Sequence, residues 1–356
     1  MRVVVCWAGM QGYVAACLRA LNGIPSIDLH VVHLDFQDLP FQEELLHEVS
    51  NQRLMASESN TVIPELVAKW NPDIVFLCGW FYEPYRRLVD RPELRSARFV
   101  LGMDTPWTGT WQQRLNQVRL RGFMRRMDKV MVAGTRSAEF ARRLDAAPAK
   151  IVNGLYGFDF TGFREHGGRR LDATPEWPRR FLFAGRYTRV KGIDVLVEAY
   201  RRYRALVDDP WPLDCCGTGP EAALLQEEGI RDLGYVQPSG LPRLFAEHGV
   251  FVMPSREEPW GVAIAEAAAT GLPLVCTAVC GAADDLLRSY YNGVTVPPDD
   301  APALADAMTW MHQNHGRLRE LGLRSRQLAH AFSAEAWAER MQACFAGALN
   351  AGRLTR

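Results

Sequence analysis

Short apolar runs, each followed by a longer stretch with helical periodicity, recur along the whole chain. In the first half these runs are residues 1–6, 30–34, 74–78, 99–101 and 129–132, and in the second half they are residues 181–184, 213–216, 231–233, 250–253 and 274–277. Apolar runs of this length that alternate with helices are typical of parallel strands covered on both faces. The pattern therefore predicts an α/β protein with doubly wound parallel sheets.

A break in this pattern predicts where one domain ends and the next begins. Glycine and proline are frequent in residues 167–170 and 173–178, which indicates a linker. The length of 356 residues also suits two domains of roughly 100–200 residues each. We expect an N-terminal domain over residues 1–170, a C-terminal domain over residues 171–335 and a terminal helix over residues 336–356.

Composition narrows the classes of function. The 41 basic and 41 acidic residues give a formal net charge of zero, which argues against nucleic-acid binding by the chain as a whole. The eight cysteines form no CxxC motif and have no histidine at zinc-ligand spacing, so we expect buried thiols in a reducing compartment. No apolar run is long enough for a signal peptide or a membrane span, which predicts a cytoplasmic protein.

Two glutamates eight positions apart, Glu258 and Glu266, flank a predicted junction between a loop and a helix. If the helix begins near Gly261, the amides of Gly261, Val262 and Ala263 lack partners within the helix and attract phosphate. Carboxylates repel phosphate but accept hydrogen bonds from sugar hydroxyls. The arrangement indicates a nucleotide sugar. The plainer interpretation is that one glutamate complements the helix dipole and the other is solvated.

A second motif follows the apolar run at residues 181–184. It places Gly185 and Arg186 at the end of a predicted strand, and Lys191 and Gly192 before a predicted helix. Glycine permits a tight turn there, and the two cations are suitable donors to a diphosphate. The alternative is a solvated basic loop.

Both motifs resemble those of retaining glycosyltransferases of family 4, which have the GT-B fold. The positions that match the pattern P-S-x-x-E-x-x-G-x-x-x-x-E-A-x-x-x-G-x-P include Pro254, Ser255, Gly261, Glu266, Gly271 and Pro273. The resemblance is strongest over residues 181–300. It implies two Rossmann-like domains that face each other across a cleft, with the last helix crossing back to the first domain. The N-terminal domain would bind the acceptor, and the C-terminal domain would bind the nucleotide sugar. The resemblance also implies a nucleoside-diphosphate sugar as co-substrate, with no metal and no cofactor.

The resemblance assigns catalytic roles to Arg186, Lys191 and Glu258, and the position of Asp104 makes it a fourth catalytic candidate. Arg186 and Lys191 would stabilise the leaving diphosphate, and Glu258 would contact the sugar. Asp104 departs from the family pattern, because many relatives carry a histidine in the comparable stretch. Its carboxylate would bind an acceptor hydroxyl, orient the donor sugar or act as a base. Alternatively it caps the turn before Thr105 and Pro106, which is a common role for aspartate.

Several backbone positions are predicted to bind the donor. Gly9 and Gly12 form a glycine turn between the first strand and the first helix, and Gly185 ends a later strand. Gly217 and Val236 lie in turns where relatives place the nucleotide. The remaining predicted donor contacts are Gly261, Val262, Ala263 and Glu266. For Gly9, Gly12, Gly217 and Val236, a plain structural turn is the alternative.

Residues 114–129 carry a basic run, Arg114 to Lys129, with apolar residues interleaved. A basic amphipathic helix of this kind would bind the anionic surface of the inner membrane face. Alternatively, it would be a solvated surface helix. Trp107 and Trp111, nearby, would stack on an acceptor sugar or pack the loop down.

The sequence therefore predicts a retaining glycosyltransferase that serves glycan biosynthesis. It would move a sugar from a nucleoside-diphosphate sugar to a hydroxyl of a glycan, a lipid-linked acceptor or a small molecule. Two alternatives stay open. One is a non-catalytic module that binds nucleotide sugars. The other is a different GT-B enzyme such as a nucleotide-sugar epimerase or a glycan phosphorylase, although the chain is short for the latter.

Overall fold

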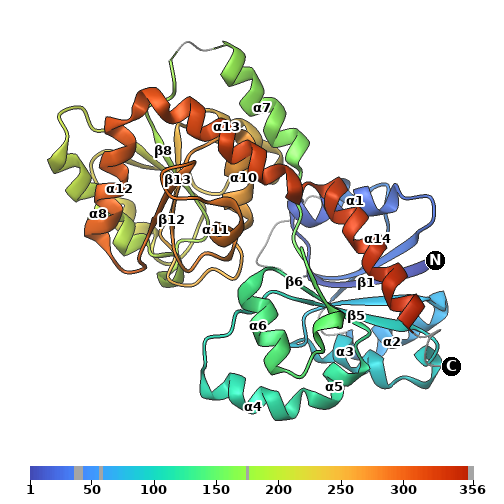
Figure 1. The fold of residues 1–356 in the computed structure, drawn as a ribbon. Coiled ribbons are helices and arrows are strands. Elements are labelled where there is room, and N and C mark those ends of the chain that lie inside the picture. Colours follow the sequence, from blue (N-terminus) through green and yellow to red (C-terminus); the bar gives the residue numbers. More distant parts are fainter. Residues whose placement is uncertain (36–42, 56–58, 174–175, 352–356) are drawn as a thin grey trace. The chain divides into compact units, whose positions relative to one another are not determined.

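The computed structural model describes residues 1–35, 43–55, 59–173 and 176–351. Contacts between residues divide the chain into two compact units (Figure 1). Unit 1 comprises Met1–Phe158 together with the C-terminal segment from Ala334, and unit 2 comprises Asp159–Ser333. The two predicted doubly wound sheets are confirmed, with one sheet in each unit.

In the part of unit 1 that the structure describes, seven parallel strands form a sheet in the order β3-β2-β1-β4-β5-β6-β7. The strands are β1 (Arg2–Gly9), β2 (Asp28–Asp35), β3 (Ser50–Met55), β4 (Ile74–Cys78), β5 (Arg98–Met103), β6 (Lys129–Val132) and β7 (Ile151–Asn153). The helices are α1 (Gly12–Asn22), α2 (Ser59–Trp70), α3 (Glu83–Arg86), α4 (Trp111–Arg119), α5 (Arg121–Arg126), α6 (Thr135–Arg143) and α14 (Ala334–Ala351).

The core of unit 1 follows from the alternation of side chains along its strands. Val4 and Cys6 of β1 join a buried cluster that includes Ile63 and Val67 of α2. Helix α14 packs against α1, and the two lie side by side in Figure 1. The predicted return of the C-terminal helix to the first domain is therefore confirmed.

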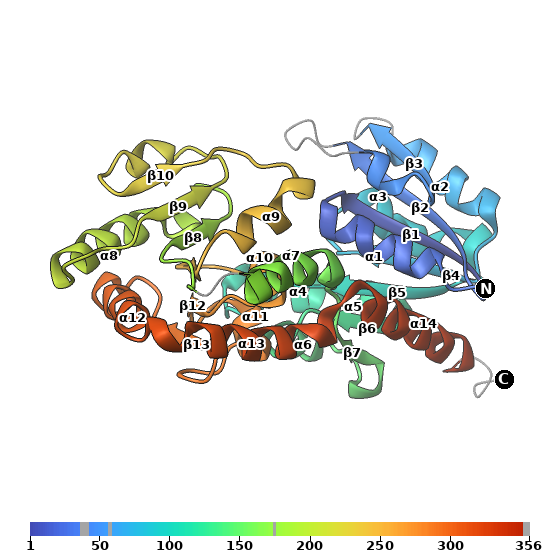
Figure 2. The ribbon, with the colours of Figure 1, turned by 90° about the horizontal axis from the view of Figure 1, so that it is seen from above.

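In the described part of unit 2, six parallel strands form a sheet in the order β10-β9-β8-β11-β12-β13. The strands are β8 (Phe181–Ala184), β9 (Leu213–Cys216), β10 (Ile230–Asp232), β11 (Val250–Met253), β12 (Leu274–Thr277) and β13 (Gly293–Val296). The helices are α7 (Phe160–Ala173), α8 (Ile193–Leu206), α9 (Leu241–Ala246), α10 (Val262–Thr270), α11 (Gly281–Leu286), α12 (Ala301–Gln313) and α13 (Leu318–Ala329). Helices α8 and α12 pack together, as Figure 2 shows, and α10 packs against α7 and α13.

Two sequence interpretations need correction in the described structure. Residues 167–170, predicted as part of a linker, belong to helix α7 of unit 2, and the units divide between Phe158 and Asp159. The reason is close packing, because a Cβ at Gly167 would lie 1.9 Å from the Thr270 carbonyl oxygen at the end of α10. Gly167 thus allows α7 to approach α10, and the same glycine in a linker would serve no such contact.

The basic run is also not one helix. Helix α4 ends with Leu120 as its C-cap, α5 covers Arg121–Arg126, and Lys129 begins strand β6. Leu120 is buried, as are Phe123 and Met124 of α5. The run therefore folds as two short helices anchored by apolar residues, with most of its arginines exposed.

Candidate active site

The sheet edge at which β8 and β11 end is the topological switch point of unit 2. After β8 the chain forms β9 and β10 on one side, whereas β11 lies on the other side of β8. Ligands of open α/β sheets bind outside the carboxyl ends of the strands at such a point. The loops that leave these two strands, residues 185–191 and 254–261, carry the predicted basic and acidic motifs. The fold therefore brings the two motifs to one place.

Lys191 and Glu258 form an ion pair at this edge. The Lys191 ammonium donates a hydrogen bond to Glu258 Oε2, and the Ser255 hydroxyl donates to the same oxygen at 3.4 Å. The side chains of Lys191 and Glu258 are only 15% and 9% exposed. Because solvent screens such a pair weakly, each charge holds the other in place. The sequence predicts both as site residues, and their pairing is a finding of the structure.

The close approach of the two loops depends on Gly192. This residue has a φ of 70°, and a Cβ there would lie 2.3 Å from the Pro254 carbonyl oxygen. Glycine alone meets both demands without strain. A second link joins the loop after β11 to α8, because the Arg256 guanidinium donates to the Asp194 carboxylate at 2.7 and 2.8 Å. This hydrogen bond is the main cause of the lowered pKa of Asp194.

Arg186 is available to a ligand. Its side chain is exposed and forms no ion pair or hydrogen bond with any residue that the structure describes. The preceding residue, Gly185, is held in place because its own amide donates a hydrogen bond to the Cys216 carbonyl at 2.9 Å. An unpaired guanidinium presents forked donors that suit a phosphate. Lys191 differs from Arg186 because it already has a charged partner. When an anion binds, the Lys191 ammonium must either break its ion pair with Glu258 or interact with Glu258 and the anion together.

Helix α10 begins directly after Gly261, as the sequence predicts. The Ile264 amide donates to the Gly261 carbonyl at 3.0 Å. The amides of Gly261, Val262 and Ala263 donate to none of the described residues. Three free donors at the start of a nine-residue helix make a favourable position for an anion.

Glu266 lies farther along α10 and has an unusual environment. Desolvation, together with the negative charge of Asp159, raises the pKa of Glu266 to about 8. Its side chain keeps partial exposure, and its carboxylate accepts no hydrogen bond from the described residues. A carboxyl group with unused acceptor capacity is suited to hydroxyl donors such as those of a ribose. Asp159 is not predicted by the sequence, since it lies more than 100 positions away in the chain.

The loops after β8 and β10 are tied together beside this site. Tyr187 Oη donates to Asp232 Oδ1 at 2.7 Å, and the Gly234 amide donates to the same oxygen at 2.8 Å. Burial is the main cause of the raised pKa of Tyr187, and its hydrogen bond to Asp232 also raises it. Tyr187 is therefore a neutral donor that fixes the loop between Arg186 and Lys191.

The predicted residues Gly217 and Val236 lie at the same edge of the sheet. The Gly217 amide donates to the Gly234 carbonyl at 2.9 Å. Burial raises the pKa of the Cys216 thiol to about 11, while a hydrogen bond from the Val236 backbone lowers it. These contacts are what plain turns would make, and a role in donor binding stays a prediction for both residues.

Two buried polar atoms in these loops were not predicted from the sequence. Thr188 Oγ1 and Glu221 Oε2 are inaccessible to solvent and have no hydrogen-bond partner among the described residues. The Glu221 amide donates to the Tyr187 carbonyl at 3.0 Å, so the two loops are in contact. Buried polar atoms without a partner are rare in folded proteins.

Unit 1 has its own switch point, between β1 and β4. Gly9 ends β1 and Gly12 begins α1, as predicted, while Cys78 ends the neighbouring strand β4. Burial raises the pKa of the Cys78 thiol, and the charge of Asp104 raises it further. Donor contact through Gly9 and Gly12 stays a prediction.

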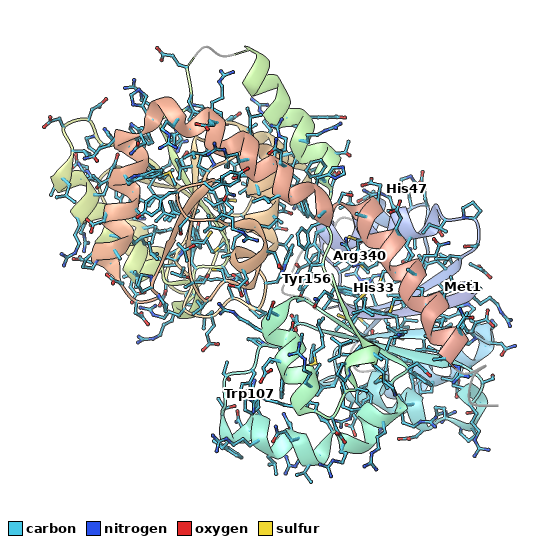
Figure 3. The ribbon with its side chains drawn as sticks, viewed as in Figure 1. Met1, His33, His47, Trp107, Tyr156 and Arg340 are labelled. Carbon is cyan, nitrogen blue, oxygen red and sulfur yellow. The ribbon has the colours of Figure 1, made fainter. Side chains whose placement is uncertain are left out.

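Asp104 follows β5 and is held by a tyrosine. Tyr156 Oη donates to Asp104 Oδ2 at 2.8 Å, and the Tyr156 ring, labelled in Figure 3, lies edge-on to Tyr13 with 5.8 Å between ring centroids. Burial, Tyr13 and Asp104, in that order, raise the pKa of Tyr156, which keeps it a donor. The Asp104 carboxylate is thus fixed by Tyr156, which is distant in the sequence. Within the described structure, the carboxylate accepts no hydrogen bond from the turn that follows it. Neither tyrosine was predicted.

The two tryptophans near Asp104 differ. Trp107 packs against Phe140 at 5.5 Å between ring centroids, and the Arg143 guanidinium lies 4.5 Å from the Trp107 centroid. Trp107 therefore packs its loop down. Trp111, in contrast, is 71% exposed.

Comparison with known proteins agrees with this geometry. Residues 178–314 match the family described as "Glycosyl transferases group 1". The D-rhamnosyltransferase WbpZ of Pseudomonas aeruginosa is 25% identical over 251 residues, which cover 65% of this chain and 64% of that protein. The D-inositol 3-phosphate glycosyltransferase of Salinispora tropica is 29% identical over 225 residues, or 56% of this chain and 46% of that protein. The aligned parts thus span less than two-thirds of these relatives.

Solved structures show the same fold over nearly the whole chain. Sucrose-phosphate synthase from Thermosynechococcus elongatus has a TM-score of 0.76 at 18% identity and covers 99% of this chain and 100% of its own. Anabaena HepE in complex with UDP and glucose has a TM-score of 0.74 at 15% identity, with 96% and 98% covered. The fold is that of the GT-B glycosyltransferases. Residues 178–314, which hold the unit 2 site, match the group 1 family, so the predicted resemblance is confirmed.

Proposed function

We propose that the protein is a retaining glycosyltransferase that moves a sugar from a nucleoside-diphosphate sugar to a hydroxyl acceptor. The observation that carries this proposal is the meeting of Lys191, Glu258 and the free amides of α10 at the unit 2 switch point. Cationic and amide donors beside a carboxylate match a diphosphate next to a hydroxyl-rich sugar. The HepE complexes with UDP and with UDP-glucose support it from the same fold.

Each group of unit 2 then has a definite role. Arg186, Lys191 and the first-turn amides of α10 hold the diphosphate. Glu258 accepts hydrogen bonds from the sugar hydroxyls, and Glu266 accepts them from the ribose. The structure pairs Lys191 with Glu258. When the diphosphate binds, Lys191 interacts with both anions, and Glu258 turns unused lone pairs to the sugar.

In the proposed reaction, the acceptor oxygen forms a bond to the anomeric carbon on the face from which the diphosphate leaves. The bond between that carbon and the phosphate oxygen breaks, its electron pair goes to the diphosphate, and the departing oxygen takes the acceptor proton. The anomeric configuration is thereby retained. Because Arg186, Lys191 and the amides stabilise the charge that develops on the diphosphate, we propose that no metal or cofactor is required. Asp104, positioned by Tyr156, would orient the acceptor hydroxyl.

The surface of helices α4 and α5 supports a location for this activity. Arg114, Arg121 and Arg125 are exposed there, and Trp111 and Val118 are 71% and 73% exposed. None of the helices that the structure describes is long and apolar enough to cross a bilayer. We propose peripheral contact between this surface and an anionic membrane at its cytoplasmic face. The acceptor would be a glycan, a lipid-linked molecule or a small molecule.

Calorimetry with the bare nucleoside diphosphate and with the nucleotide sugar tests the assignment. Glu266→Gln should weaken both ligands, because its partner is the ribose. Glu258→Gln should leave the bare nucleotide nearly unaffected and weaken only the nucleotide sugar, because its partner is the sugar. The reverse pattern would refute the proposed orientation, and no binding of any nucleotide sugar by the wild type would refute the function.

A further inference from the structure

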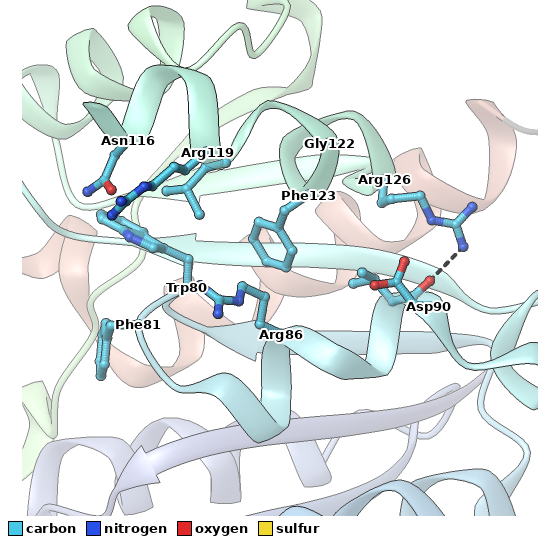
Figure 4. Close-up of a pocket in the computed structure, with 11 residues that line it drawn as sticks. Trp80, Phe81, Arg86, Asp90, Asn116, Arg119, Gly122, Phe123 and Arg126 are labelled. Carbon is cyan, nitrogen blue, oxygen red and sulfur yellow. Dashed lines mark hydrogen bonds between the residues drawn. The ribbon is translucent and has the colours of Figure 1, made fainter. Parts of the chain in front are cut away.

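A pocket of about 720 Å³ lies in unit 1, apart from every residue assigned above to the donor or to catalysis. One wall comes from the segment after β4, with Trp80, Phe81 and Arg86. The opposite wall comes from α4 and α5, with Arg119 and Phe123. Figure 4 shows Arg86 rising from one wall and Arg119 entering from the other.

The pocket carries an excess of positive charge. Three arginines and one carboxylate line it, which leaves two formal positive charges. Arg126 is already committed, because its guanidinium donates to the Val89 carbonyl at 2.8 Å. The guanidinium groups of Arg86 and Arg119 form no ion pair or hydrogen bond with the described residues, and neither does the exposed carboxylate of Asp90. Two uncommitted guanidinium groups face one cavity without a counter-charge of their own.

Aromatic surface lies beside these charges. Phe81 is 68% exposed, and its ring lies close to the backbone at Gly79. Trp80 is held in place by Phe140, with 5.7 Å between ring centroids. Phe123 is buried in the opposite wall. A molecule that fills this pocket must therefore have an apolar or ring-shaped body as well as an anionic group.

We propose that this pocket binds a phosphate ester with an apolar or ring-shaped body. The phosphate lies between Arg86 and Arg119, and the body covers Phe81 and Trp80. A phosphate monoester carries nearly two negative charges at neutral pH, which matches the excess of two, and its oxygens suit guanidinium forks. In the proposed function Asp104 of unit 1 orients the acceptor hydroxyl, so this molecule is the acceptor or its carrier. On that last point the inference rests on the proposed function.

Titration calorimetry with octyl phosphate, in the absence of any nucleotide sugar, tests the pocket directly. We expect octyl phosphate to bind at least tenfold more tightly than octyl glucoside or inorganic phosphate. Arg86→Gln and Arg119→Gln should each weaken it about tenfold or more, because each removes a charge-assisted contact. Arg125→Gln is the matched control, since Arg125 is exposed on α5 but does not line the pocket.

Phe81→Ala covers the case in which an arginine variant fails to fold. The exposed ring contributes little to the core, so this variant should fold, weaken octyl phosphate and leave inorganic phosphate unchanged. Octyl phosphate that binds no better than octyl glucoside would overturn the inference, as would equal losses in Arg119→Gln and Arg125→Gln. Because no nucleotide sugar is present, failure here leaves the donor assignment intact, and failure of donor binding leaves this pocket intact.

Vesicles separate the two sources of a phosphate ester. Flotation with phosphatidic acid in phosphatidylcholine, compared with phosphatidylcholine alone, should be weaker in Arg86→Gln than in the wild type if the ester is a lipid headgroup. The other outcome is that the wild type binds octyl phosphate but floats with these vesicles no better than Arg86→Gln does. That outcome would assign the pocket to a soluble phosphate ester. Both outcomes support the proposed chemistry.

Discussion

Lys191 and Glu258 show how much one pair of residues determines in this protein. Each lies in a loop that leaves a strand at the switch point, and each is mostly buried with the other as its charged partner. The pair joins the two loops and holds two opposite charges where a diphosphate and a sugar are expected. Arg186 has no such partner among the described residues. Its substitution therefore tests ligand binding without disturbing the fold.

Removing the cation of this pair should destabilise the protein. Lys191→Met leaves the Glu258 carboxylate, which is 9% exposed, without its counter-charge. We expect the free energy of unfolding to fall by about 3 kcal/mol, as for other buried pairs broken on one side. The double variant Lys191→Met with Glu258→Gln should recover most of this loss, since no charge is then left unpaired. Urea denaturation measures the free energy of unfolding of both variants. A double variant that is no more stable than Lys191→Met alone would contradict the account.

The pKa of Glu266 gives a second prediction at this scale. Its value in the folded protein, about 8, lies above the ordinary value of 4.5, so the folded state prefers the neutral carboxyl. This contribution to stability is present below pH 4.5 and is lost as the pH rises through 8. Glu266→Gln cannot ionise. Relative to the wild type, it should therefore gain at least about 2 °C in melting temperature between pH 6 and pH 9. A difference in melting temperature between the variant and the wild type that stays constant from pH 6 to pH 9 would contradict this prediction.

The sequence predicted the charged residues of the candidate site but not the residues that lie beside them. Arg186, Lys191, Glu258 and Glu266 belong to local motifs with fixed spacing, so they could be predicted. Residues that only the fold brings close could not be, because they come from distant segments with no spacing signal. These are Tyr156 beside Asp104, Asp159 beside Glu266, and the Tyr187 contact with Asp232.

At the scale of elements, low burial accounts for two of the strands that were missed, β3 and β7, whereas β13 is mostly buried. The predicted apolar runs all coincide with strands of the two sheets. The strands that escaped prediction, β3, β7 and β13, each lie at the edge of a sheet. Most residues of β3 are exposed and those of β7 are at most partly buried, so both lack a continuous apolar run. An edge strand has one neighbour and less cover, which weakens the hydrophobic signal.

The contact between Gly192 and Pro254 is the element-scale feature with the sharpest consequence. Gly192→Ala introduces strain at a positive φ and a clash with the Pro254 carbonyl, which forces the two loops apart. We expect a loss of about 2 kcal/mol or more in stability and weaker nucleotide-sugar binding. The matched control is Gly168→Ala inside α7, where a Cβ meets nothing within 4 Å and should stabilise the helix slightly. Thermal melting with and without a nucleotide sugar compares the two, and similar effects would count against this role for Gly192.

At the scale of the whole molecule, the chain consists of two doubly wound units. The C-terminal helix α14 follows unit 2 in the sequence but belongs to unit 1. The sequence predicted both sheets from hydrophobic periodicity, and the resemblance to the glycosyltransferases implied that the terminal helix returns to the first domain. The division between the units was placed twelve residues too late, between 170 and 171 instead of 158 and 159. Glycines that serve helix packing in α7 resemble the glycines of a linker when only the sequence is considered.

The surface of α4 and α5 gives a prediction for the whole protein. Reversing the charge of Arg114, Arg121 and Arg125 to glutamate should abolish flotation with anionic vesicles, because each basic residue contributes on the order of 1 kcal/mol. All three are exposed, so the fold and nucleotide affinity should survive. Wild-type binding should also weaken at 1 M salt, where the Debye length is about 3 Å. Wild-type protein that does not float even at low salt would leave this surface as a solvated basic face.

The central claim is that unit 2 cleaves a nucleotide sugar with the help of Arg186. Release of nucleoside diphosphate at saturating donor measures it most directly, with water or an alcohol as the acceptor. We predict that Arg186→Ala lowers this rate between about tenfold and a hundredfold, and lowers donor affinity less, because charge on the diphosphate grows in the transition state. Arg189→Ala, in the same loop and also exposed, should behave like the wild type. Wild-type rates in both Arg186→Ala and Lys191→Ala would contradict the account.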